Sequence, residues 1–342
     1  MNRSRPPAAV NRRGFLARAA RRLGWVGLAG LVTARSRAGA PPTGGEPALR
    51  YNLDRFTKTD PKYLRFEEVG RVPSPRASLR RVTVGPSGHW YLAAGNHVCQ
   101  LHPRTGPGWE VTLASTVRCV STGPEGDLLV GVRDHLEAFD ARGQRRSTWA
   151  APGPKAWLTG VCATARDVFV ADAASRVVLH YDRGGTLLGR IGTRGAGRTG
   201  GVFVVPSPYF DVHAGPGEEL WVANPGRHRL ESFGLEGTPK TSWGVASFDL
   251  AGFCGCCNPA HFVRLRDGRF ITSEKGIPRI KVYSATGEFE GVVAGPEAFP
   301  EYLDNLNRGP VGLDVAVDEA GQVLVADTLA GAVRIFRERP SA

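Results

Sequence analysis

The chain has 342 residues, of which 42% are hydrophobic, so it is long and apolar enough to bury a globular core. Its net charge of +12 is concentrated at one end, because residues 1–40 hold nine arginines and no acidic residue. The remainder has 35 basic and 32 acidic side chains and gives no reason to expect nucleic acid or an anionic membrane as a partner.

Residues 1–40 resemble a twin-arginine export signal. Arg12 and Arg13 are followed by Phe15 and Leu16, then by a mildly apolar stretch over 23–34 and small residues at 38–40. The apolar stretch is too short and too rich in glycine for a membrane span. The resemblance implies a removable signal peptide and a mature protein that is periplasmic or secreted. A basic disordered tail is the alternative.

A linker and a repeat follow this leader. Residues 41–62 are rich in proline and glycine and indicate a linker. Residues 63–340 carry a cassette of 23 residues that fits itself three times without a gap and three more times in slightly shorter form. The six copies begin at Arg81, Cys119, Gly160, Asp211, His261 and Asp314.

Each cassette predicts three β-strands, and a fourth strand follows most copies. In the last copy the three strands span 314–317, 322–326 and 332–336. The fourth strands of the middle copies span 187–191, 240–243 and 290–294. Four-stranded units that repeat in this way are typical of propeller blades. The last copy lacks its fourth strand, and a strand predicted over 63–69 would supply it and close the ring, which removes exposed sheet edges.

The cassette also resembles the NHL repeat family. The sequence Val-Ala-Asp stands at 170–172 and at 325–327, and an arginine and a valine follow within eight residues of it in both copies. The first two copies lack the aspartate. The resemblance implies an all-β, six-bladed propeller over 63–340, a scaffold that hosts many different activities.

In such a propeller the first strand of each blade lines the central channel. Side chains alternate along a strand, so the first and third positions of each cassette share one side. The first positions are Arg81, Cys119, Gly160, Asp211, His261 and Asp314. The third positions are Thr83, Ser121, Cys162, His213, Val263 and Ala316. Two cysteines, two histidines and two aspartates are therefore expected to face the channel.

A cysteine-rich loop leads into the fifth copy and should lie over the mouth of the channel. It places three cysteines within four residues and a histidine four residues later. Thiolate and imidazole ligands suit zinc or copper. Two adjacent cysteines fit poorly on one ion, so a ligand from the channel wall is expected to complete the set. The predicted metal ligands are Cys254, Cys256, Cys257 and His261, with Cys119 or His213.

Disulfides are the alternative use of these cysteines, because six is an even number and the expected destination is oxidising. A reactive pair of Cys254 and Cys257 is a further alternative, although no helix start is evident to activate it. Cys99 is expected to be a buried small residue. The polar residues that end the second strands are expected to bind backbone N–H groups rather than a ligand. They are Asp172, Asn224, Glu274 and Asp327.

Long loops over 193–208 and 296–310 also precede first strands and enlarge the same face. These features predict an exported binding or scaffold protein that holds a small molecule, peptide or protein partner there, with a metal in the cysteine loop. The alternative is a metal- or redox-dependent extracytoplasmic enzyme centred on the same Cys/His cluster, with Asp211 or Asp314 as a base.

Overall fold

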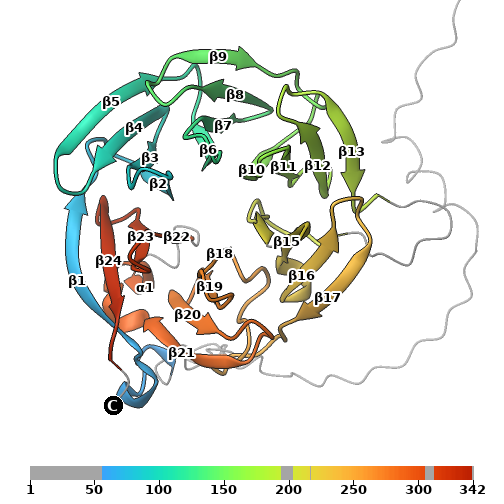
Figure 1. The fold of residues 1–342 in the computed structure, drawn as a ribbon. Coiled ribbons are helices and arrows are strands. Elements are labelled where there is room, and N and C mark those ends of the chain that lie inside the picture. Colours follow the sequence, from blue (N-terminus) through green and yellow to red (C-terminus); the bar gives the residue numbers. More distant parts are fainter. Residues whose placement is uncertain (1–55, 194–202, 216, 305–311, 341–342) are drawn as a thin grey trace, which may run out of the picture. The chain divides into compact units, whose positions relative to one another are not determined.

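The computed structural model describes residues 56–193, 203–215, 217–304 and 312–340. The predicted export signal over 1–40 and most of the predicted linker lie outside these residues. Six four-stranded antiparallel sheets are arranged in a ring around a channel (Figure 1). The predicted all-β, six-bladed propeller is therefore confirmed. No helix in the described part of the chain has the length and apolar character needed to cross a membrane.

The inner half of each blade consists of its first and second strands. The first strands, for blades 1 to 6 in chain order, are β2 (Leu79–Val84), β6 (Val117–Thr122), β10 (Leu158–Ala163), β14 (Val212–Gly215), β18 (His261–Arg264) and β22 (Asp314–Val317). The second strands are β3 (Trp90–Ala94), β7 (Leu128–Val132), β11 (Asp167–Asp172), β15 (Glu219–Asn224), β19 (Phe270–Glu274) and β23 (Val323–Asp327). The second strands are short apolar runs, as expected for strands covered on both faces.

The outer half of each blade is more polar. The third strands are β4 (His97–His102), β8 (His135–Phe139), β12 (Val177–Asp182), β16 (Arg229–Gly234), β20 (Arg279–Tyr283) and β24 (Ala332–Glu338). The outermost strands are β5 (Gly106–Thr112), β9 (Arg145–Thr148), β13 (Leu187–Ile191), β17 (Pro239–Trp243), β21 (Phe289–Ala294) and, in blade 6, β1 (Phe66–Pro73).

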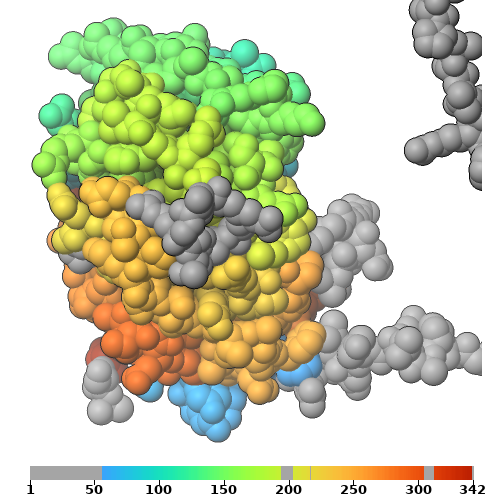
Figure 2. All heavy atoms as spheres, turned by 90° about the vertical axis from the view of Figure 1, so that its right-hand side faces the viewer, coloured from blue at the N-terminus to red at the C-terminus, as the bar shows by residue number. Residues whose placement is uncertain are grey.

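The core is divided among the blade interfaces. Six hydrophobic clusters of described residues each join two neighbouring blades. Figure 2 shows the ring from the side, with blade 3 in yellow-green beside blade 4 in yellow to light orange. Because every sheet is covered on both faces by its neighbours, the inner strands are held rigidly and can position side chains at the channel.

The N-terminal strand closes the ring as predicted, but its predicted bounds, 63–69, were wrong. Residues Pro61–Tyr63 form a short 3₁₀-helix, which Asp60 caps by accepting the backbone N–H of Lys62. The strand begins only at Phe66, whose buried ring joins the core between blades 5 and 6. From there β1 pairs along β24 as far as Pro73.

The polar residues at the ends of the second strands hold the loops of their own blades. In blades 3 to 5 each accepts the backbone N–H of the loop that leads into the first strand. These pairs are Asp172 with Trp157 (2.9 Å), Asn224 with Val204 (3.0 Å) and Glu274 with Cys254 (2.7 Å). In blade 6, Asp327 accepts the hydroxyl of Tyr302 at 3.1 Å. The predicted structural role of these residues is confirmed.

The remaining elements are short. They are the 3₁₀-helices η4 (Pro225–Arg227) and η5 (Pro296–Ala298) and the helix α1 (Pro300–Asp304). The last two belong to the long loop before blade 6.

Candidate functional site

A cluster of four buried or nearly buried polar side chains lies at the first positions of the blades, and we call it the polar plug. It consists of Arg81, Asp211, His261 and Asp314. Arg81 extends from blade 1 and donates from Nε to the carbonyl of Arg118 at 2.7 Å and from Nη2 to the carbonyl of Thr159 at 2.5 Å. Its Nη1 donates to Asp314 Oδ1 at 3.0 Å. One guanidinium therefore ties together blades 1, 2, 3 and 6.

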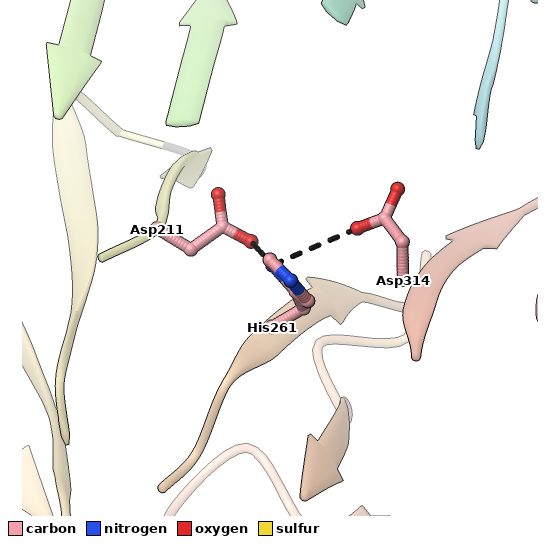
Figure 3. A group of neighbouring side chains, drawn as sticks. All are labelled: Asp211, His261 and Asp314. Carbon is pink, nitrogen blue, oxygen red and sulfur yellow. Dashed lines mark hydrogen bonds and ion pairs between the residues drawn. The ribbon is translucent and has the colours of Figure 1, made fainter. Parts of the chain in front are cut away.

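The other three residues of the polar plug point toward one another (Figure 3). His261 Nδ1 lies 3.0 Å from Asp211 Oδ2 and 3.7 Å from Asp314 Oδ1. Arg81 Nη1 lies 2.6 Å from His261 Nδ1 and 3.0 Å from Nε2. Because Arg81 can only donate, and Nδ1–H is needed for Asp211, Nε2 is the atom that accepts from Arg81.

The charges of the polar plug stabilise one another. Burial alone would lower the pKa of Arg81, but Asp314 and Asp211 raise it above its usual value. Burial alone would raise the pKa of Asp211, but the hydrogen bond from His261 and the charge of Arg81 lower it below its usual value. The arginine therefore stays a cation and Asp211 stays a carboxylate.

Three residues of the polar plug are of types that can bind a metal ion. They are Asp211, His261 and Asp314. Among the described residues they are the only three His, Cys, Asp or Glu side chains whose ligand atoms all lie within 4.8 Å of one another. The Nη1 of Arg81 is bonded to Asp314 and lies within 3.0 Å of both His261 nitrogens. The guanidinium thus supplies, at the centre of the group, the positive charge that a divalent cation would bring.

The cysteine loop is held by Asn258, which sequence reasoning did not single out. Its Nδ2 donates to the carbonyls of Cys254 (2.7 Å) and Lys275 (3.0 Å), and its Oδ1 accepts the N–H of Lys275 at 2.9 Å. Cys254 is buried beside it. Cys256 is exposed and Cys257 is buried, and their Sγ atoms are 3.1 Å apart.

A buried ionic cluster of Glu274, Arg279 and Lys281 is bonded to the same loop. Glu274 accepts from Arg279 Nε at 2.6 Å and lies 3.1 Å from Lys281 Nζ, and all three side chains are at most 2% exposed. Lys281 Nζ also donates to the carbonyl of Gly252 at 2.5 Å. Burial lowers the pKa of Lys281 to about 8, even though Glu274 opposes the shift. Glu274 links these cations to the loop through the N–H of Cys254.

The remaining predicted ligands belong to the channel wall. The Cys119 sulfur packs against Gly131 in the core between blades 2 and 3, and burial raises its pKa to about 12. His213 lines the channel and donates from Nδ1 to the carbonyl of Ala214 at 2.9 Å, and burial lowers its pKa. The six predicted ligands thus occupy the cysteine loop, the polar plug and the channel wall, and a metal site made from them stays a prediction.

The buried thiol of Cys119 makes a testable contribution to pH dependence. An ordinary thiol has a pKa of 9.0, so above pH 9 the unfolded chain loses this proton while the folded chain keeps it up to about pH 12. Stability is therefore lost with rising pH across this window, by about 1.4 kcal/mol per pH unit for the one thiol. We expect Cys119→Ala to reduce the alkaline slope of the unfolding free energy by that amount in urea titrations. Ser121→Ala, in the same strand, should leave the slope unchanged; an equal slope in wild type and Cys119→Ala would refute the assignment.

Two cavities meet at Arg81. The channel cavity, about 240 Å³, is lined by the first strands, including the predicted channel-facing residues Thr83, Cys162 and His213. The mouth cavity, about 90 Å³, is lined by loops and strand starts around Arg81. Its lining also includes Arg80, Arg118, Trp157, Tyr209 and His261. Since Arg81 lines both cavities, its guanidinium lies between them.

The mouth cavity is strongly basic. Three arginines and no acidic residue line it. The Arg118 guanidinium stacks on the Trp157 ring at 3.7 Å from the centroid. Burial lowers the pKa of Arg118, and the charges of Arg80 and Arg133 lower it further. Arg118 Nε and Trp157 Nε1 are buried and have no hydrogen-bond partner among the described residues.

Tyr209, from the loop before blade 4, connects this cavity to Lys275, whose backbone is bonded to Asn258 of the cysteine loop. The Tyr209 ring packs edge-on against His261, with 5.7 Å between centroids, and lies 4.9 Å from Lys275 Nζ. Burial alone would raise the pKa of Cys257, but hydrogen bonds with Lys275, Ser207 and Cys256 lower it.

Sequence reasoning missed the mouth cavity, although a signal was present. Arg80 and Arg118 each stand directly before the first position of their cassettes, in the two copies that lack the repeat's aspartate. Considering the residue before each first position, as well as the first and third positions, would have identified both arginines.

Comparison with solved structures supports the fold. A streptogramin B lyase structure aligns with a TM-score of 0.57, covering 80% of this chain and 97% of its own, at 14% identity. A virginiamycin B lyase from Staphylococcus aureus aligns with a TM-score of 0.55, covering 81% and 89%, at 13% identity. A protein of unknown function from Bacteroides caccae aligns with a TM-score of 0.50, covering 63% and 81%, at 13% identity.

No protein-family model and no curated protein matches the sequence. At these identities the likeness to solved structures shows the fold alone. The resemblance to the NHL repeat family stays a prediction.

Proposed function

We propose that this propeller is an exported binding protein that holds the anionic group of a ligand in the mouth cavity. The observation that carries the proposal is a cavity lined by three arginines and no acidic residue, two of whose lining residues, Arg118 and Trp157, each have a buried donor without a partner among the described residues. Export rests on the twin-arginine pattern of residues 1–40.

The chemistry of these donors favours a carboxylate, phosphate or sulfate. A buried donor without a partner costs about 1–3 kcal/mol, and an anionic oxygen would recover that cost through a charge-assisted hydrogen bond. The like charges of Arg80, Arg118 and Arg133, which lower the pKa of Arg118, would be compensated at the same time. An anion is therefore the ligand class that removes both penalties.

The size of the cavity limits how much of the ligand enters. Whole small-molecule sites usually measure about 300–1,000 Å³, whereas the mouth cavity measures about 90 Å³. Only the anionic end of a ligand would fit, and the rest would lie against the surrounding loops. A small organic acid or the acidic end of a peptide meets this requirement.

Binding fits the polar plug better than turnover does. One ring nitrogen of His261 bonds to Asp211, and the other accepts from Arg81. Asp211 and Arg81 are in turn bonded to the backbone. A general base needs a free nitrogen within reach of a substrate proton. The reactions named for the structural neighbours are therefore not transferred to this chain.

Isothermal titration calorimetry of the folded protein with sulfate, phosphate and a dicarboxylate tests the proposal. We expect at least one of these anions to bind, with an affinity that falls as ionic strength rises. Arg118→Gln removes a charged donor and should weaken binding by about tenfold or more. Arg142→Gln, on an exposed turn of blade 2, should bind as wild type does. Binding that Arg118→Gln leaves unchanged, or none by any of the three anions, would contradict the proposed site.

A further inference from the structure

The adjacent cysteines of the loop before blade 5 carry a second chemistry, independent of the anion site. Their Sγ atoms are 3.1 Å apart, within hydrogen-bond distance and without a bond. Cys256 is exposed, whereas Cys257 is 1% exposed. The structure, which describes all six cysteines, places no other two sulfurs within hydrogen-bond distance. We infer that Cys256 and Cys257 form a redox pair that closes to a disulfide by exchange with an external disulfide.

The loop around the pair is fixed, so the two sulfurs stay close. Asn258 bonds to the carbonyl of Cys254 on one side and to the backbone of Lys275 on the other. The N–H of Cys254 is bonded to Glu274, and the ring of Phe253 is fully buried. Residues on both sides of the pair are therefore anchored to blade 5, while the Cys256 side chain faces solvent.

Cys256 reacts first because only its sulfur is exposed, although the hydrogen bond with Cys257 raises the pKa of Cys256 above its usual value. The Cys256 thiolate, which solvent reaches, attacks one sulfur of the external disulfide, breaks that S–S bond and releases one thiolate. The Cys257 thiolate then attacks the Cys256 sulfur and releases the second. The pair gives up two electrons and two protons, the external disulfide takes up the electrons, and its two released thiolates take the protons.

The closed pair should be easy to reduce. Cα atoms joined by a disulfide are usually about 4.4–6.8 Å apart. Cα atoms of adjacent residues are only about 3.8 Å apart across a trans peptide. A disulfide between neighbours is therefore strained, and strained disulfides have higher reduction potentials than structural ones. This chemistry suits a reversible switch rather than a permanent crosslink.

The other four cysteines do not compete for the role. Cys99, Cys119, Cys162 and Cys254 are buried. Of the six cysteines, Cys256 is the one whose side chain an external disulfide can reach.

Treating the reduced, folded protein with oxidised glutathione, followed by peptide mass spectrometry, tests the inference. We expect wild type and the control Cys99→Ser to lose two hydrogen masses on the peptide holding Cys256 and Cys257, and to recover them under a mild thiol reductant. Cys257→Ser should stop at a glutathione adduct on Cys256, because the second thiol is missing. Cys256→Ser should remain unmodified, because Cys257 is buried. Far-UV circular dichroism checks that each variant is folded.

Three results would overturn the inference. The first is wild type that accumulates the glutathione adduct without closing the pair. The second is a disulfide that links either cysteine to Cys254 or to the channel wall. The third is stoichiometric metal, found by elemental analysis, that protects the loop thiols from glutathione, which would instead support the predicted zinc or copper site. None of these outcomes depends on whether the mouth cavity binds an anion.

Discussion

Replacing Arg81 with methionine is expected to lower the free energy of unfolding by about 3–5 kcal/mol, the usual cost of leaving a buried charge without its partner. The variant keeps most of the side-chain volume but removes the cation that compensates Asp314 and Asp211. It also leaves the carbonyls of Arg118 and Thr159 without their donor. Urea or guanidinium unfolding, followed by tryptophan fluorescence, measures the change.

Arg337→Met is the matched control. Arg337 forms an ion pair with Glu67 on the outer surface of blade 6, where its side chain is 60% exposed. Exposed pairs contribute little, so this variant should unfold nearly as wild type does. If both variants unfold at the same denaturant concentration as wild type, the Arg81 guanidinium does not hold the channel together.

The same position allows a sharper test of the charge in the polar plug. Arg81→Ala leaves Asp211, His261 and Asp314 with no shared cation and with room for one. We expect magnesium or manganese to raise the melting temperature of this variant and to leave that of wild type unchanged. An equal response in both proteins would mean that the three residues do not need a cation at their centre.

Glu274→Gln is expected to cost about 3–5 kcal/mol as well, for a related reason. The substitution keeps the shape of the side chain but leaves Arg279 and Lys281 as buried cations with no carboxylate between them. It also weakens the acceptor of the Cys254 N–H, which anchors the cysteine loop. Native-state alkylation should then reach Cys254, which wild type keeps buried.

The control for this variant is Glu288→Gln, on an exposed turn of the same blade. It should change neither the unfolding midpoint nor the alkylation of Cys254. Loss of stability in Glu274→Gln with Cys254 still protected would show that the loop is held by Asn258 alone. No loss of stability would contradict the assignment of Glu274 as the partner of both cations.

The architecture was predictable because it depends on local patterns. The strand predicted over 187–191 has the bounds observed for β13, and that over 314–317 has those of β22. Alternation along the predicted first strands also placed Asp211 and Asp314 at the channel, where they lie. The closing strand was misplaced by three or four residues, since its predicted first residue, Tyr63, belongs to the capped turn at Pro61–Tyr63.

The chemistry of the site was less predictable, because it depends on how far side chains reach across the ring. A strand pattern places Arg81 at the channel but does not show that its guanidinium crosses to blades 2, 3 and 6. Likewise, the spacing of Cys257 and His261 does not show their neighbours. His261 bonds to Asp211 and Arg81, and Cys257 lies beside Lys275 and Ser207.

The mouth cavity was missed for a different reason. Its basic character arises from Arg80 and Arg118, which are far apart in the sequence and come from blades 1 and 2. What marks the site is the lack of acidic partners around them, and that is a property of the folded arrangement.

Anomalous diffraction from crystals grown with selenate, an oxyanion that stands in for sulfate or phosphate, tests the proposed binding site most directly. We expect a selenium peak in the mouth cavity, with selenate oxygens within hydrogen-bond distance of Arg118 Nε and Trp157 Nε1. A peak only at exposed arginines elsewhere, or an acidic side chain found paired with Arg118 in the crystal, would contradict the proposed anion site.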